Sequence, residues 1–172
     1  NFCHYKSNGN KIKNTIFIIG DCFAETFSPI LSENLPLENY DFISMNSSNC
    51  YFLPNFNSKR PQTKDLPCDI PFQEKRLKKI KENPGSIIIL SGLWTMYFKE
   101  GTFLNPNNKE QDMFDGYKKT ISSLIKDGHK IIQMTPPIIY PEPVSNKIFF
   151  HSKYVNKSEK YLKNITRHTE KY

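Results

Sequence analysis

Several features that mark particular classes of protein are missing from this sequence. Its 172 residues contain no window that approaches the roughly 18 to 20 consecutive apolar residues of a membrane span. The N-terminus lacks the basic and apolar regions of a signal peptide. No C-x-x-C pair is present, which argues against a structural zinc site. As written, the chain is therefore expected to be soluble and to hold no metal.

Glycine is scarce, with 7 in the chain. The stretch GDCFAE, residues 20–25, has one glycine where phosphate-binding loops have two or three. A flavodoxin-like domain that binds a nucleotide or phosphate is therefore the least favoured of the functions considered, and we expect no cofactor.

Acidic residues are fewer than basic ones. The chain has 17 Asp and Glu and 24 Lys and Arg, which gives a net charge of +7. Such a charge is compatible with an anionic partner such as nucleic acid. The lysines are spread along the chain, however, and the two dense clusters, residues 74–83 and 151–163, lie on expected helices with solvated outer faces. We therefore predict no nucleic-acid partner.

What the sequence does have is a globular composition, with 37% hydrophobic and 13% aromatic residues. At this length we expect one domain spanning residues 1–172. Apolar runs that end at Gly or polar residues predict buried strands, and apolar residues at helical spacing predict helices between them. The expected strands are 14–21, 40–46, 86–94 and 129–137; the expected helices are 22–35, 71–83, 109–128 and 155–172, with Pro29 kinking or shortening the first.

Strands that alternate with helices predict an α/β fold, a parallel sheet with helices on both faces. In such sheets the working residues lie beyond the carboxyl ends of the strands. The loops after Gly20, Asn46, Leu90 and Thr135 are therefore the places to look for chemistry.

Cys50 and Cys68 bracket a loop rich in Pro, Asn and Lys that has little apolar periodicity. A disulfide between them would stabilise this loop by restricting the unfolded chain. Two free thiols in a cytosolic protein are the alternative, and the spacing does not distinguish the two. If the disulfide forms, the compartment is oxidising.

Cys22 is the candidate nucleophile, because it opens a helix directly after the first buried strand. Unpaired amides and the helix dipole at such a position lower a thiol's pKa and favour the thiolate. The same amides are suited to hold the oxyanion of a tetrahedral intermediate. The alternative is that Cys22 is a small core residue, which is what a cysteine near a strand end more often is.

Five blocks in order carry a family resemblance: Cys3, FIIGDCFAETFSPIL (17–31), SSNC (47–50), IIILSGLWTMY (87–97) and DGHKIIQMTPPIIYPEP (127–143). The strand, Gly-Asp-nucleophile and helix order resembles the SGNH hydrolase superfamily. It is most similar to the SGNH domain fused behind membrane acyltransferase 3 proteins, which O-acetylate bacterial cell-surface glycans. The resemblance implies a three-layer, flavodoxin-like SGNH hydrolase fold with a central parallel sheet.

Three features depart from that family pattern. Cys22 stands where the family has Ser, and Phe23 stands where this branch usually has His. No D-x-x-H motif, which carries the family's base and its orienting Asp, follows the last helix. We therefore expect a domain truncated at its C-terminus, without its last strand. His151 follows the fourth strand on the expected side, and it is the one histidine that we weigh as a substitute base, against the alternative of a plain surface histidine.

The remaining site residues are assigned from the resemblance and from position. Gly92 and Asn46 are candidate oxyanion donors beside the Cys22 amide. Trp94 is expected to stack on a sugar ring, against the alternative of a core aromatic that we favour for Tyr97. Asp21 and Phe23 are expected beside the substrate, with Asp21 also holding the turn through its own hydrogen bonds.

The resemblance implies acyl transfer onto a carbohydrate through a thioester on Cys22, in a periplasmic O-acyltransferase or esterase system. The implied partners are a carbohydrate acceptor, an acyl donor and a membrane acyltransferase domain, and we expect a monomer. The alternative is a non-catalytic relative that binds a glycan or positions an acyltransferase partner.

Overall fold

A computed structural model describes residues 2–5, 14–56, 68–101 and 108–134 of the chain. The chain divides into two compact units, Asn1–Pro136 and Pro137–Tyr172. All elements below belong to the first unit. The expected helix at 155–172, His151, and the end at which a strand was expected to be missing all lie outside the described residues.

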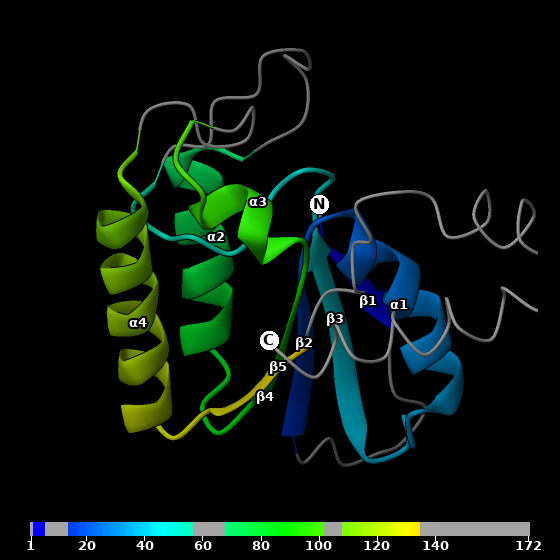
Figure 1. The fold of residues 1–172 in the computed structure, drawn as a ribbon. Coiled ribbons are helices and arrows are strands. Elements are labelled where there is room, and N and C mark those ends of the chain that lie inside the picture. Colours follow the sequence, from blue (N-terminus) through cyan, green and yellow to red (C-terminus); the bar gives the residue numbers. More distant parts are fainter. Residues whose placement is uncertain (1, 6–13, 57–67, 102–107, 135–172) are drawn as a thin grey trace, which may run out of the picture. The chain divides into compact units, whose positions relative to one another are not determined.

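A mixed sheet of five strands in the order β1-β3-β2-β4-β5 forms the centre of this unit (Figure 1). Strands β2, β3, β4 and β5 are parallel, and β1 pairs with β3 in the antiparallel direction. Gly20, the last residue of β2, lies opposite Asn46 on β3 and Ser91 on β4. The strands are β1 (Cys3–Tyr5), β2 (Asn14–Gly20), β3 (Tyr40–Asn46), β4 (Ile87–Ser91) and β5 (Lys130–Gln133).

Helices cover both faces of the sheet, as Figure 1 shows, with α1 on one side and α2 and α4 on the other. Ala24 of α1 packs with alternate residues of the central strands on one face. Ile80 of α2 and Leu124 of α4 pack with the intervening strand residues on the opposite face. The helices are α1 (Cys22–Asn34), α2 (Ile70–Lys81), α3 (Trp94–Phe98) and α4 (Glu110–Lys126). The α/β sandwich expected from the sequence is therefore confirmed.

Side-chain caps begin the first two long helices. Asp21 accepts a hydrogen bond from the Phe23 amide at the start of α1, and Asp69 accepts one from the Phe72 amide at the start of α2. Of the two effects expected of Pro29, a kink or a shortening, the shortening does not occur, because helix α1 runs through this proline to Asn34. Burial of Ala24 and Ser28 against the sheet holds the helix together across the lost backbone hydrogen bond.

Two elements differ from the sequence expectation. Strand β1 was not predicted because three residues are too short to show a period, and it makes the sheet mixed rather than wholly parallel. The third expected strand, 86–94, ends at Ser91, and Trp94 opens the short helix α3 instead. Gly92 and Leu93 connect the strand to this helix, and the Leu93 amide donates to Asp21.

Candidate functional site

The candidate site lies at the carboxyl edge of the sheet, where β2 turns into α1. A Cβ atom on Gly20 would lie 1.6 Å from the Ser91 carbonyl oxygen and 2.8 Å from Cβ of Ala24. No other residue fits between the β4 backbone and the first turn of α1. The apolar run ends at glycine because the neighbouring strand and the following helix both approach the backbone there.

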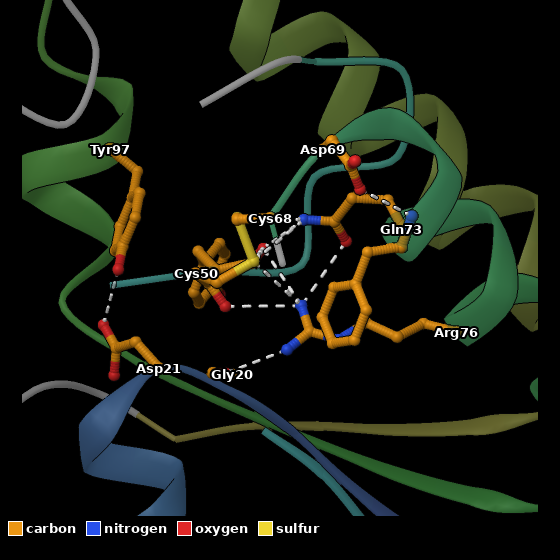
Figure 2. Close-up of a disulfide and its surroundings, with 10 residues drawn as sticks. Gly20, Asp21, Cys50, Cys68, Asp69, Gln73, Arg76 and Tyr97 are labelled. Atoms are coloured by element: carbon orange, nitrogen blue, oxygen red, sulfur yellow. Dashed lines mark hydrogen bonds between the residues drawn. A yellow bond between two sulfur atoms is a disulfide. The ribbon is translucent and has the colours of Figure 1, made fainter. Parts of the chain in front are cut away.

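Asp21 joins this turn to the loop that follows β4. Its Oδ1 accepts from the Phe23 amide at 2.9 Å, and its Oδ2 accepts from the Leu93 amide at 2.9 Å and the Tyr97 hydroxyl at 3.2 Å. Figure 2 shows the Tyr97 hydroxyl directed at this carboxylate. Asp21 is only 2% exposed. The carboxylate therefore holds the turn, as expected, and contact of Asp21 with a substrate stays a prediction.

Cys22 is exposed and free at the first position of α1. Burial of its sulfur and the negative charge of Asp21 raise the pKa of the Cys22 thiol, and Glu25 adds to the increase. The amides of Cys22 and Phe23 lower that pKa but do not outweigh the increase. The expectation that the helix start lowers the pKa of the Cys22 thiol is therefore wrong in sign, because partial burial of the sulfur, and then the charge of the capping carboxylate, outweigh the two amides.

Asn46 directs its side chain toward α1. Its Nδ2 donates to Ser28 Oγ at 2.7 Å and to Ser44 Oγ at 2.8 Å, and these two hydroxyls lie 3.1 Å apart. Both amide hydrogens of Asn46 are thereby directed at serine hydroxyls. In this structure the Asn46 side chain braces β3 against α1, and the oxyanion role expected of it needs that network to open.

Gly92 follows β4 and packs closely against the turn. A Cβ atom there would lie 2.7 Å from Cδ2 of Tyr51 and 3.0 Å from Oδ2 of Asp21. The lack of a side chain at Gly92 therefore lets the Asp21 carboxylate and the Tyr51 ring approach the loop after β4.

The aromatic residues of this loop separate into buried and accessible ones. Tyr97 is buried and stacks on Tyr51 with ring centroids 5.6 Å apart. Trp94 is 39% exposed and contacts Phe98 edge to face at 6.4 Å. The core interpretation of Tyr97 is confirmed, and part of the Trp94 side chain is accessible at the start of α3. Phe23 is partly buried.

Comparison with protein families agrees with this arrangement of strand, capped turn and helix. A family model described as an SGNH domain fused to AT3 domains matches residues 1–170. The chain belongs to this family of SGNH domains. Its function is accordingly associated with acyltransferases. Neither the curated proteins nor the solved structures include a significant match.

The disulfide expected in this SGNH domain is present between Cys50 and Cys68, whose Cα atoms are 5.5 Å apart. It ties the loop after β3 to the residue before the N-cap of α2, and Figure 2 shows Gln73 and Arg76 of α2 directed at it. Gln73 Nε2 donates to the Tyr51 carbonyl at 2.7 Å and lies 3.5 Å from Cys50 Sγ. The disulfide and α2 together hold the loop after β3.

Sequence reasoning missed Arg76, which was assigned to a solvated face of α2 but is fully buried. Gln73, Arg76 and Ile80 are the buried residues of this helix. Their spacing of three and four residues is that of one helix face, which was the signal available in the sequence. The many lysines of this helix made all of it look solvent-exposed in the sequence.

A second cluster that the sequence did not reveal lies at the end of β5 in the SGNH domain. The hydroxyls of Tyr51 and Tyr117 both donate to Oε1 of Gln133, the former at 3.0 Å. Burial raises the pKa of both tyrosines, so both hydroxyls stay protonated and keep these bonds. Gln133 thereby links the last described strand to α4 and to the loop after β3.

The two histidines among the described residues lie on or beside the edge strands β1 and β5, whereas Cys22 follows the central strand β2. His4 is exposed on the edge strand β1. His129 precedes β5 and forms a hydrogen bond of 2.8 Å from Nδ1 to Ser86 Oγ at the amino end of β4, as its place in the sequence predicted. It is 5% exposed, so its interpretation as a surface histidine is wrong.

Within residues 2–5, 14–56, 68–101 and 108–134, no group of three His, Cys, Asp or Glu side chains is placed to hold a metal ion. Among the same residues, no helix is both long and apolar enough to cross a membrane.

Proposed function

We propose that this SGNH domain transfers an acyl group to a carbohydrate hydroxyl through a thioester on Cys22. The observation that carries the proposal is the exposed Cys22 at the start of α1, in a chain that belongs to a family of SGNH domains fused to AT3 domains. The rigid turn formed by Gly20, Asp21 and Gly92 supports a reacting group that must keep its orientation.

The reaction has two steps. In the first, Cys22 Sγ attacks the acyl carbonyl carbon, a C–S bond forms, and the donor's leaving group departs with the thiol proton. In the second, a sugar hydroxyl oxygen attacks the thioester, the C–S bond breaks, and the proton returns to Cys22. The Cys22 amide and the backbone at Gly92 are the proposed oxyanion donors in both steps.

The raised pKa of Cys22 means that the thiol is protonated at neutral pH, so the first step needs a proton acceptor. His151 is the residue of this chain that we propose for it. Trp94, which is 39% exposed, is the side chain that we propose to stack on a sugar ring, and we propose the partly buried Phe23 as a second substrate contact.

An AT3 domain is the proposed source of the acyl group, and the periplasm is the proposed location. The family's fusion to AT3 domains supports the partner. The Cys50–Cys68 disulfide supports the location, because disulfides form and persist in oxidising compartments.

The same pKa favours a second candidate, a non-catalytic domain that binds a glycan or positions the acyltransferase. A protonated thiol is a weak nucleophile. In this candidate the carboxyl edge of the sheet is a binding surface, and Cys22 carries no acyl group.

Mass spectrometry of the intact protein after exposure to a small activated acetyl ester distinguishes the two candidates. We expect one acetyl adduct on the wild-type protein and on a Cys3→Ser control, and none on Cys22→Ala. Cys3 is the matched control because it is the other exposed free cysteine among the described residues. Equal labelling of the three proteins, or no labelling, would favour the non-catalytic domain.

A further inference from the structure

Arg76 is a fully buried arginine whose side chain spans from α2 to the carboxyl edge of the sheet. Its Nη1 donates to the carbonyls of Cys50 at 3.3 Å and Tyr51 at 3.4 Å and lies 3.5 Å from Cys50 Sγ. The Phe72 ring lies 4.5 Å from the guanidinium carbon. The guanidinium is therefore held in one orientation from several sides, as Figure 2 shows.

The other end of the guanidinium reaches the nucleophile turn. Nη2 of Arg76 donates to the Gly20 carbonyl at 3.2 Å. That carbonyl belongs to the peptide that connects Gly20 to Asp21, and Cys22 follows immediately. A bond to this oxygen sets the plane of the peptide from which the turn begins.

Folding alone does not require Arg76 at two of these carbonyls, because each has a second donor. The Gly20 carbonyl also accepts from the Ser47 amide at 3.1 Å, and the Tyr51 carbonyl also accepts from Gln73 Nε2 at 2.7 Å. A buried guanidinium carries a desolvation penalty, and an apolar residue of similar size often stabilises such a position equally well. The particular contribution of Arg76 is that one rigid, forked group joins the disulfide loop to the Gly20 peptide.

We propose that Arg76 is a positioning residue for Cys22, acting through the Gly20 carbonyl from the opposite face of the sheet. The proposal rests on the proposed role of Cys22 in acyl transfer. The guanidinium does not touch the substrate; it fixes the peptide that orients Asp21 and the thiol.

The test compares Arg76→Lys with Gln73→Leu in the Cys3→Ser protein. Lysine keeps the positive charge but has no fork with which to hold both the loop and Gly20. Leucine at position 73 removes the bond to the Tyr51 carbonyl and the weak 3.5 Å bond that Arg76 Nη1 donates to Gln73 Oε1, but it leaves the Gly20 bond in place. Three quantities are measured for each variant: thermal unfolding, the rate of Cys22 acetylation by the activated ester, and the rate of Cys22 alkylation by iodoacetamide against pH.

For Arg76→Lys we expect a cooperative thermal transition with a midpoint below that of the parent, because the buried charge and the Cys50 carbonyl lose hydrogen bonds. We also expect about a tenfold loss of acetylation rate, because small misplacements of a reacting group are costly. We further expect the alkylation rate of Cys22 to change about threefold near the midpoint of its dependence on pH. The reason is that the pKa of the thiol depends on burial, on Asp21 and on the amides of this turn. For Gln73→Leu we expect both rates to stay within about twofold of the parent, because the Gly20 bond remains.

Equal effects of the two variants, or parental rates in Arg76→Lys, would overturn the proposal. Arg76→Met, a second variant that keeps an unbranched side chain but removes the charge, is made as a check on folding. Failure of both Arg76→Lys and Arg76→Met to fold would also overturn the proposal, because Arg76 would then act on the whole fold. If the parent protein takes up no acetyl group, the proposed function fails, and the alkylation profiles still decide whether Arg76 positions Cys22.

Discussion

Asp21 influences Cys22 in two ways, since it caps α1 and places a negative charge beside the thiol. The cap begins the helix that presents the sulfur, while the charge opposes formation of the thiolate. An acyl transfer that starts from this cysteine therefore depends on removal of a proton more than a cysteine at an uncharged helix start would.

Replacing Asp21 with Asn is predicted to lower the pKa of Cys22. Burial still raises that pKa, but the negative charge of Asp21 is removed. The pH profile of iodoacetamide alkylation should move to lower pH, and stability should fall by about 1 to 2 kcal/mol because an amide has one acceptor oxygen where the carboxylate has two. Glu25→Gln is the control and should give a smaller shift in the same direction, because Glu25 raises the pKa least. An unchanged profile in Asp21→Asn would contradict the prediction.

Replacing Gly92 with Ala is predicted to cost about 1 to 3 kcal/mol of stability and to change the alkylation rate of Cys22. The new Cβ would meet the Tyr51 ring at 2.7 Å and the Asp21 carboxylate at 3.0 Å. Urea unfolding measures the first effect and iodoacetamide the second. Gly85→Ala is the control, since Gly85 has a φ of 72° with nothing within 4 Å of its added Cβ. It should lose stability through backbone strain and leave Cys22 unchanged; the same alkylation change in both variants would count against the prediction.

His129 is predicted to make stability depend on pH. Burial lowers its pKa in the folded protein, and the charge of Asp127 offsets part of this decrease. The unfolded chain therefore binds a proton at a higher pH than the folded protein does, and stability is lost as pH falls from about 6.5 toward the folded pKa. The urea midpoint should fall between about pH 7.5 and 5.5, and the fall should be smaller in His129→Gln. A fall of equal size in both proteins would assign it to other groups.

At the scale of elements, the Cys50–Cys68 disulfide holds the loop after β3 against the start of α2. Removing it in a Cys50→Ala, Cys68→Ala double variant is predicted to cost about 3 kcal/mol, since the cysteines are separated by 18 positions. Urea unfolding of the double variant and the parent, both without reductant, measures the difference. The parent in reductant should approach the variant. A double variant as stable as the parent would show that Gln73 and Arg76 suffice to hold this loop.

The long elements were predictable, and the short ones were not. Strands β2 and β3 were predicted at nearly their observed bounds. Strand β2 is a continuous apolar run that ends at Gly20, and β3 is a short segment with aromatic and β-branched residues that ends at Asn46. Strand β1 and helix α3 have too few residues to show a period, and both depend on packing against elements distant in the sequence.

At the scale of the whole molecule, the topology of the sheet brings the candidate site together. Strands β2, β3 and β4 are parallel neighbours, so their carboxyl ends lie at one edge of the sheet. The turn with Cys22, the loop with Asn46 and the loop with Gly92 come together there because parallel strands end on the same side. The functional assignment of this edge rests on that topology and on membership of the SGNH family.

The sequence by itself determined the α/β class, the place of Cys22 at a strand-to-helix turn and the family, because these follow from local apolar periods and from motifs in order. Only the tertiary structure decided the burial of Arg76, the direction of the Asn46 amide and the sign of the Cys22 pKa shift. Each of these depends on which groups from distant parts of the chain lie within a few ångströms of one another. Burial and electrostatic interactions between such groups have no signature in a local sequence pattern.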